Sequence, residues 1–167
     1  MEFLNDMQLY FRGEKVESAV ILLISLSLLL ASIALIFWVR QPFTKGLGTV
    51  LLLAALIGVS VGGAVFFRTD SQVSELASVY TSGRQAFVDA EGQRIDKVVE
   101  SFRYYRFMYI VSGIVALGLV SLTRSPALHG AAVGLFVFAA MGFAIDHYAE
   151  ERAIWYAEKV HAQASPD

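Results

Sequence analysis

The sequence contains no cysteine, three prolines and few charged residues, which make up 17% of its 167 positions. The lack of cysteine excludes disulfides, thiolate metal sites and thiol redox chemistry. A hydrophobic share of 56% and a mean hydropathy of +0.58 exclude an ordinary soluble domain, a disordered tail and a fibrous protein. Lys and Arg number 13 against 15 Asp and Glu, so no excess of positive charge indicates nucleic acid as a partner.

Four long stretches of the chain carry no Asp, Glu, Lys or Arg. They cover residues 18–39, 46–67, 107–123 and 125–145, and each is close to the ~20 residues that cross about 30 Å of hydrocarbon. We therefore predict an all-α integral membrane protein with four transmembrane helices, in which residues 1–167 form a single domain. We expect the lipid bilayer to be its first partner and the bacterial inner membrane to be its location.

The two short connections between these stretches share an Arg-x-Pro-x-x-(Lys/His)-Gly pattern. The second copy lies 84 positions after the first, and the register continues beyond it, as listed here: Arg40 with Arg124, Pro42 with Pro126, Lys45 with His129, Gly46 with Gly130, Leu51 with Leu135, Gly58 with Gly142 and Arg68 with Arg152. The pattern predicts a duplicated helical hairpin whose copies have the same orientation and are related by an axis along the membrane normal. In the alternative interpretation, two tight turns have independently selected Pro and Gly.

Because both short turns lie on one side of the membrane, both termini and residues 68–106 must lie on the other. Residues 68–106 are predicted to form an extramembrane helical segment, with one helix ending near Gly83 and another starting after Gly92 and running into the third span. The fourth span should continue as a helix to His161, and its inward face is expected to carry Phe143, His147, Glu150, Ile154, Ala157 and His161. The bundle should thus project from the membrane on one side.

The distribution of basic residues bears on orientation. The side with the termini has 10 Lys and Arg and the short turns have 3, so the positive-inside rule places both termini in the cytoplasm. The density of basic residues favours the opposite orientation, because the turns carry their 3 in about 14 residues with no acid.

Ionisable residues gather where the predicted helices leave the membrane on the side of the termini. Carboxylates from neighbouring helices with a His three residues from a Glu can hold a metal ion in a helical bundle. The candidate ligands for one transition metal ion (Zn, Fe, Cu or Mn) are Glu17, Glu100, His147 and Glu150, with Glu14, Asp70 and Glu151 as second choices. A ferritin-type pair of metals is not expected, because the Glu/His pair occurs once and in the order His-x-x-Glu.

The alternative for these residues is ion pairing with Arg12, Arg103, Arg106 or Arg152, in which case the protein has no cofactor. No catalytic residues are assigned: the sequence contains no nucleophile elbow, P-loop, dinucleotide fingerprint or His-Glu-x-x-His motif. We therefore do not expect an enzyme.

The spans themselves offer two further interpretations. The lack of charges inside them argues against an energy-coupled transporter. Glycines in the second and fourth spans favour close helix packing, or else line an uncharged oligomeric channel or small transporter; they are Gly58, Gly62, Gly63, Gly130 and Gly134.

Apolar residues outside the spans lead to the functional prediction. They include Phe3, Leu4, Leu9, Tyr10, Phe11, Phe87, Trp155 and Tyr156, more than solvated tails require. We predict a small non-enzymatic membrane protein that acts through protein interaction, with another membrane protein or with its own copies, in an assembly, regulatory or immunity-type role. The alternatives are a metal-binding or metal-dependent function at the carboxylate/His site, and a channel or small transporter.

Overall fold

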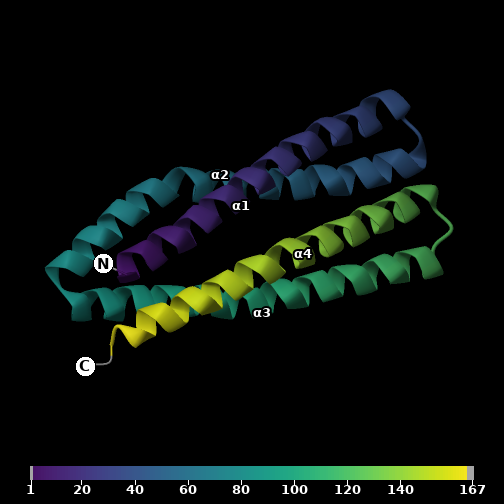
Figure 1. Cartoon of the computed structure of the whole chain (residues 1–167). Helices are drawn as coiled ribbons and strands as arrows, with labels where there is room; N and C mark the ends of the chain where they lie inside the picture. Colours follow the sequence, from purple (N-terminus) through teal and green to yellow (C-terminus); the bar gives the residue numbers. More distant parts are fainter. Residues whose placement is uncertain (1, 165–167) are drawn as a thin grey trace.

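A computed structural model describes residues 2–164 as four long helices. They are α1 (Glu2–Ala34), α2 (Pro42–Ser82), α3 (Arg84–Leu122) and α4 (Pro126–Ala162), and a π-helical turn, η1 (Leu35–Val39), extends α1. The described part of the chain contains no strand, which confirms the all-α prediction (Figure 1). All four helices are long and apolar enough to cross a membrane, so the fold is compatible with an integral membrane protein.

The ends of the helices follow from local sequence. Pro42 and Pro126 each occupy the first turn of a helix, where the missing backbone N–H has no partner to lose. Gly83 separates α2 from α3: its N–H donates to the Val79 carbonyl at 3.0 Å, and its own carbonyl accepts from the Phe87 N–H at 3.0 Å. The junction of α2 and α3, the start of α1 and the end of α4 lie at one end of the molecule, opposite the two short turns (Figure 1).

The predicted break at Gly92 was wrong, because α3 runs through this residue without interruption. Gly92 is buried, and a Cβ added to it would lie 3.4 Å from Cε1 of His161 on α4. A single glycine costs a helix about 1 kcal/mol relative to alanine, a cost that packing against α4 can offset.

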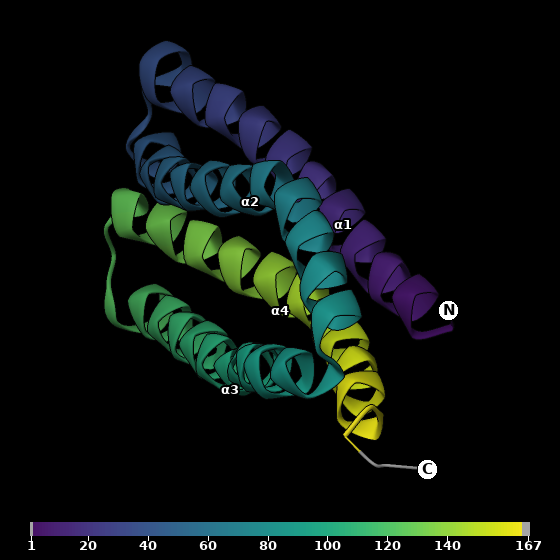
Figure 2. The same cartoon turned by 90° about the vertical axis from the view of Figure 1, so that its left-hand side faces the viewer.

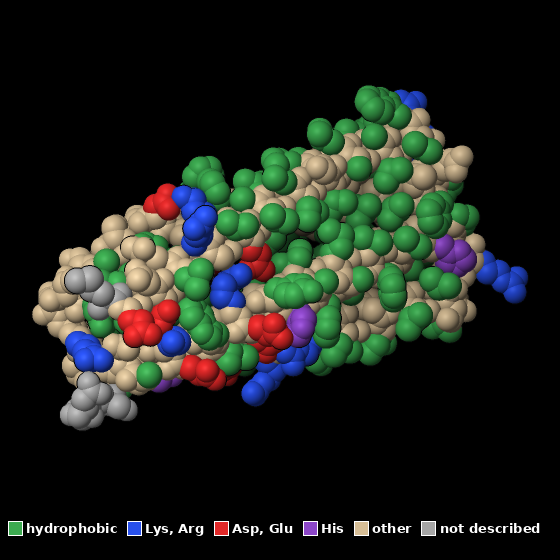
Figure 3. Space-filling model, viewed as in Figure 1, with side chains coloured by type: hydrophobic (Ala, Val, Ile, Leu, Met, Phe, Trp, Pro, Cys, Tyr) green, Lys and Arg blue, Asp and Glu red, His purple; other side chains and the backbone are tan. Residues whose placement is uncertain are grey.

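The molecule divides along its length into two halves of different chemistry. We call residues 18–67 and 107–145 the apolar half, and residues 2–17, 68–106 and 146–164 the polar half. Charged side chains gather over the polar half, while the apolar half shows a hydrophobic surface until the short turns are reached (Figure 3). This division matches the prediction that the bundle extends on one side beyond its apolar segments.

The helices pack as two antiparallel hairpins, α1 with α2 and α3 with α4. Across the apolar half the order is α1, α2, α4, α3, so α2 and α4 form the centre (Figure 2). Towards Gly83 the second part of α2 crosses over α4 to reach the start of α3 (Figure 2). The two hairpins run in the same direction, as predicted.

The contact between α2 and α4 is reciprocal. A Cβ on Gly46 would lie 1.8 Å from the Ala127 carbonyl oxygen, and a Cβ on Gly130 would lie 1.9 Å from the Phe43 carbonyl oxygen. Gly130 follows Gly46 by 84 positions, and Ala127 follows Phe43 by the same number. Each hairpin therefore presents the same surface to the other, which is the property of a two-fold axis between α2 and α4. The predicted repeat is a repeat of the three-dimensional structure.

The polar half has its own hydrophobic core. Its buried members come from α1, α3 and α4 and are Phe3, Met7, Tyr10, Phe11, Phe87, Val88, Ile95, Phe102, Ala153, Tyr156, Ala157 and Val160. The rings of Tyr10 and Tyr156 stack with centroids 4.2 Å apart. Of the eight apolar residues that led to the interaction hypothesis, five are buried in this core and Leu4 and Trp155 pack against it. Leu9 alone among them is largely exposed, at 60%.

The predicted inward face of α4 was wrong in this half. His147, Ile154 and His161 are exposed, and the buried positions are instead Ala153, Tyr156, Ala157 and Val160. The face is rotated because α4 packs between α1 and α3 there, and Tyr156 fills the space against the α1 aromatics. Of the predicted face, only Ala157 is buried.

Candidate functional site

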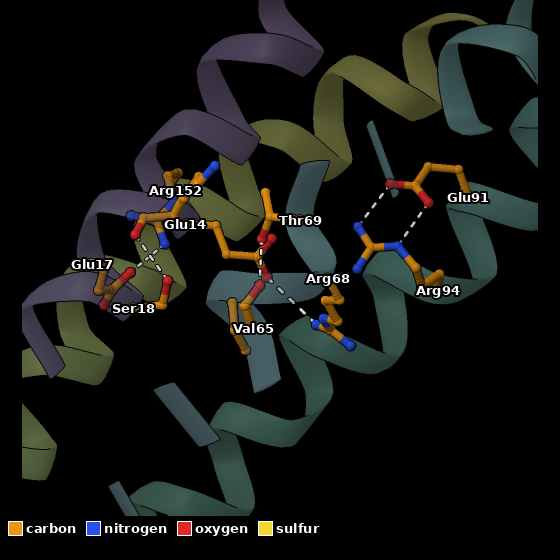
Figure 4. Close-up of polar contacts among 10 residues, drawn as sticks. Glu14, Glu17, Ser18, Val65, Arg68, Thr69, Glu91, Arg94 and Arg152 are labelled. Atoms are coloured by element: carbon orange, nitrogen blue, oxygen red, sulfur yellow. Dashed lines mark hydrogen bonds and ion pairs between the residues drawn. The ribbon is translucent and has the colours of Figure 1, made fainter. Parts of the chain in front are cut away.

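Ionisable side chains meet in two groups where the apolar half ends. The first group lies between α1, α2 and α4 and contains Glu14, Glu17, Arg68 and Arg152 (Figure 4). The second lies on α3 and α4 and contains Arg106, Tyr109, Asp146, His147 and Glu150. Both are at the level where the helices would leave the hydrocarbon.

In the first group, Arg152 of α4 forms an ion pair with Glu17 of α1. Glu14 of α1 faces Arg68 of α2, with 3.7 Å between Oε1 and the guanidinium nitrogen. Glu14 Oε2 and Arg152 Nε are buried and have no hydrogen-bond partner among the described residues. Burial raises the pKa of Glu14 above its usual value, and the cations Arg68, Arg94 and Arg152 oppose this shift.

A third ion pair lies deeper in the polar half. Arg94 donates from two nitrogens to the two carboxylate oxygens of Glu91, each at 2.7 Å, and Glu91 is 1% exposed. The pair sits beside Tyr10 and Tyr156, and burial raises the pKa of Tyr10 to about 12. Burial and the negative charge of Glu91 also raise the pKa of Tyr156. Both partners belong to α3, so the contact with α1 is made by the Arg94 guanidinium, which lies 5.5 Å from the centroid of the Phe11 ring.

The second group lines a cavity of about 370 Å³ together with Phe102 and Phe143. Arg106 forms an ion pair with Glu150. The Tyr109 hydroxyl donates to Asp146 Oδ2 at 2.8 Å, and the His147 ring lies 3.7 Å from Glu151. The cavity therefore brings a cation, two carboxylates, a phenol and an imidazole to one side of the bundle.

The structure brings together two of the four predicted metal ligands: His147 and Glu150 line the 370 Å³ cavity, whereas Glu17 and Glu100 do not. Glu17 pairs with Arg152, Glu150 pairs with Arg106, His147 is exposed, and Glu100 is exposed on α3 without an ion pair among residues 2–164. The second choices are paired as follows: Glu14 with Arg68, Asp70 with Lys15, and Glu151 with His147. Within the described residues no three His, Asp or Glu side chains form a group that could hold a metal ion. The metal-dependent function stays a prediction that only metal analysis tests.

Sequence reasoning missed two features of these sites. Glu91 and Arg94 have the i, i+3 spacing of a helical ion pair, but the assumed break at Gly92 hid it. The hydrogen bond of Tyr109 to Asp146 could not be derived from spacing, because it joins two different helices. The repeat did carry a signal, because Asp146 stands where the first copy has Gly62.

The glycines of the spans are mostly found at close contacts between helices. A Cβ on Gly58 would lie 2.0 Å from Ser25 Oγ, one on Gly134 would lie 2.9 Å from Val50 Cβ, and Gly63 has no such neighbour within 4 Å. Backbone contact at Gly46 and Gly130 closes the centre of the bundle near the short turns. The channel hypothesis thus concerns a pore between copies of the chain, and it stays a prediction.

Comparisons with protein families, with curated proteins and with solved structures gave no match. The internal repeat therefore supplies the available comparison. Each residue of one hairpin can be compared with its equivalent 84 positions away. A residue type that occurs in both copies is one that the shared fold can require, whereas a residue type that occurs in one copy is not required by the fold.

Proposed function

We propose that this protein spans a membrane with its apolar half and acts by binding another membrane protein through a groove between α1 and α4. The groove measures about 550 Å³. Its lining is Leu9, Arg12, Gly13, Val16, Glu17, Val20, Ile21, Ile145, Tyr148 and Arg152. It begins in the polar half and continues into the apolar half.

The observation that carries the proposal is a difference between the two repeats. Leu9, Val16 and Tyr148 are exposed by 60%, 59% and 69%. Their equivalents in the other repeat are Gln93, Glu100 and Ala64. Because two of these equivalents are polar and the third is a small alanine, the fold itself does not need large apolar side chains at these positions. A large exposed apolar surface favours an interaction site.

Lipid does not account for the whole groove. Leu9 precedes the first residue of the apolar half by nine positions, or about 13 Å of helix. The headgroup layer on one side of a bilayer is about 5 to 8 Å thick. Leu9 therefore reaches beyond the headgroups, where an exposed leucine is better covered by protein than by lipid.

The chemistry of the groove defines the partner. An occupant that follows it from Leu9 to Ile21 and Ile145 must itself cross the membrane surface as an apolar helix. Arg12 is exposed on the groove and forms no ion pair with residues 2–164. A partner helix with a carboxylate at the membrane surface would complement Arg12, and charged groups at the edge of an apolar contact select the partner.

Site-specific photocrosslinking in native membranes tests the proposal. A photoreactive residue at position 9 or 16 should yield one discrete adduct, and the same residue at the equivalent positions 93 or 100 should yield none. Leu9→Gln with Val16→Glu gives α1 the residues of α3 and should abolish the adduct seen from a photoreactive residue at position 20. Equal labelling from both faces, or an adduct that survives this double variant, would contradict the proposal. An adduct of two copies of this chain would identify self-association instead of a different partner.

A further inference from the structure

Another cavity lies inside the apolar half and shares two lining residues, Ile21 and Ile145, with the groove of the proposed function. It measures about 270 Å³ and is lined by all four helices. Its lining comes in equivalent pairs from the two repeats, among them Ser25 with Tyr109, Gly58 with Gly142 and Val61 with Ile145. The cavity therefore lies on the two-fold axis of the repeat, and we call it the central cavity. Figure 3 shows the surface hollowed between the two hairpins in the apolar half.

The central cavity is apolar except at the end nearest the polar half. There the second repeat contributes Asp146 and Tyr109, joined by the 2.8 Å hydrogen bond, where the first repeat has Gly62 and Ser25. Because the first repeat has Gly62 and Ser25 at these positions, the fold itself does not require an acid or a tyrosine there. An acid in such surroundings is costly, which makes it a candidate for function rather than for stability.

Gly142 makes the hydrogen bond possible. A Cβ at this position would lie 2.4 Å from Cε1 of Tyr109 and 2.9 Å from its hydroxyl oxygen. The Tyr109 ring thus lies close against α4 at a position where α4 has no side chain, and its hydroxyl reaches Asp146 one helical turn away. Tyr109, Gly142 and Asp146 together form a built polar end to an apolar cavity.

Asp146 and Tyr109 also line the 370 Å³ cavity on α3 and α4, so they lie between the central cavity and the surface of the bundle. Arg106, the cation of that outer cavity, is paired with Glu150. Among the described residues, the Asp146 carboxylate accepts one hydrogen bond, from the Tyr109 hydroxyl. This hydroxyl carries no charge. The charge left without a counter-ion at this end of the central cavity is therefore negative.

We propose that Asp146 binds the protonated primary amine of a membrane amphiphile whose apolar chain lies in the central cavity. Surrounding lipid gives such a molecule access to the apolar half, and the cavity provides the arrangement typical of ligand sites, an apolar wall with few polar groups at one end. An ammonium group donates to the free carboxylate oxygen as a charge-assisted hydrogen bond. Tyr109 is a positioning residue, because its hydroxyl holds the carboxylate toward the cavity.

The test uses the full chain in nanodiscs and a photoreactive long-chain primary amine as the probe. Labelling should map to the cavity wall, for example to Met108 or Met141, and an unlabelled amine should compete better than the alcohol of the same chain length. Asp146→Asn keeps the shape and removes the charge, and it should weaken labelling about tenfold, the size expected for one hydrogen bond to a charged group. Glu151→Gln, an exposed carboxylate on the same helix, should leave labelling unchanged.

Two results would overturn the inference: equal labelling of wild type and Asp146→Asn, or equal competition by the amine and the alcohol. The second would mean that the cavity takes apolar chains without recognising the head group. If Asp146→Asn fails to fold, Asp146→Gly replaces it, because it restores the residue that the first repeat has at this position. The binding partner of the α1/α4 groove plays no part in this experiment, so its outcome is independent of the proposed function.

Discussion

Phe3 and Phe87 hold equivalent positions in the two repeats, and their rings meet edge to face with centroids 5.4 Å apart. Two equivalent residues can touch each other only close to the axis that relates them. The same relationship holds at the other end, where Gly134 packs against its equivalent, Val50. The two-fold axis therefore runs along the whole bundle, through the core of the polar half as well as the contact between α2 and α4.

Removing a ring from this axis should weaken the polar half. Phe87 is fully buried, so Phe87→Ala removes its contacts with Phe3 and Tyr80 and leaves a cavity, with an expected cost of about 3 to 5 kcal/mol. Chemical unfolding in detergent, followed by circular dichroism, measures the change. Phe67→Ala is the control, because that ring is 79% exposed; an equal loss in both variants would mean that the core is not organised around Phe87.

The contact between α2 and α4 should depend on the absence of side chains. Gly46→Ala places a Cβ in the backbone of α4, which cannot move as a flexible side chain could, and should separate the helices and lower the thermal unfolding temperature. Gly113→Ala adds a Cβ where nothing lies within 4 Å and should be neutral or slightly stabilising. A Gly46 variant as stable as the Gly113 variant would refute this packing.

The contribution of the Glu91–Arg94 ion pair to stability can be tested by substituting the residues that the first repeat has at the equivalent positions. Their equivalents are Met7 and Tyr10. Glu91→Met alone leaves Arg94 with a half-buried, unpaired charge and should cost about 3 to 5 kcal/mol. Glu91→Met with Arg94→Tyr removes both charges and should recover most of that loss, as a double-mutant cycle on unfolding free energies would measure. Additive losses would show that the two residues do not stabilise each other.

Glu14 should make stability depend on pH. Its raised pKa means that the folded state holds the proton more tightly than the unfolded state does. The stability that this group contributes is therefore complete below pH 4.5, its ordinary pKa, and is lost as the pH rises from 4.5 through the folded pKa. Glu14→Gln should make the unfolding temperature fall less over this range than it does in wild type. Identical pH profiles for the two proteins would contradict the assignment.

Orientation can be measured directly because the chain has no cysteine of its own. Gln41→Cys lies in a short turn and Gln85→Cys lies beside Gly83, at the opposite end of the bundle. With termini in the cytoplasm, as the count of Lys and Arg predicts, a membrane-impermeant maleimide should label position 41 in intact cells and position 85 after lysis. The reverse pattern would place the polar half outside, and labelling of both in intact cells would contradict four membrane spans.

The sequence by itself determined the class, the four helices, the position of the short turns and the repeat. These features follow from composition and local spacing: uncharged runs of membrane length, and a Pro and a Gly recurring at an offset of 84 positions. The sequence also offered ion pairing as one interpretation of Glu17 and Glu150, and these residues do pair with Arg152 and Arg106. It did not decide which arginine each would meet.

Tertiary structure decided which faces of the helices are covered. The apolar residues of α4 do not by themselves define which face of the helix points inward. Only packing against α1 and α3 placed Tyr156, rather than His147, on the inward face. The same packing buried the aromatics that had indicated a partner and left Leu9, Val16 and Tyr148 exposed. It also joined Tyr109 to Asp146 across 37 positions of sequence. Such contacts depend on how whole helices rotate and cross, which is set by all their contacts together and not by the spacing of residues within one helix.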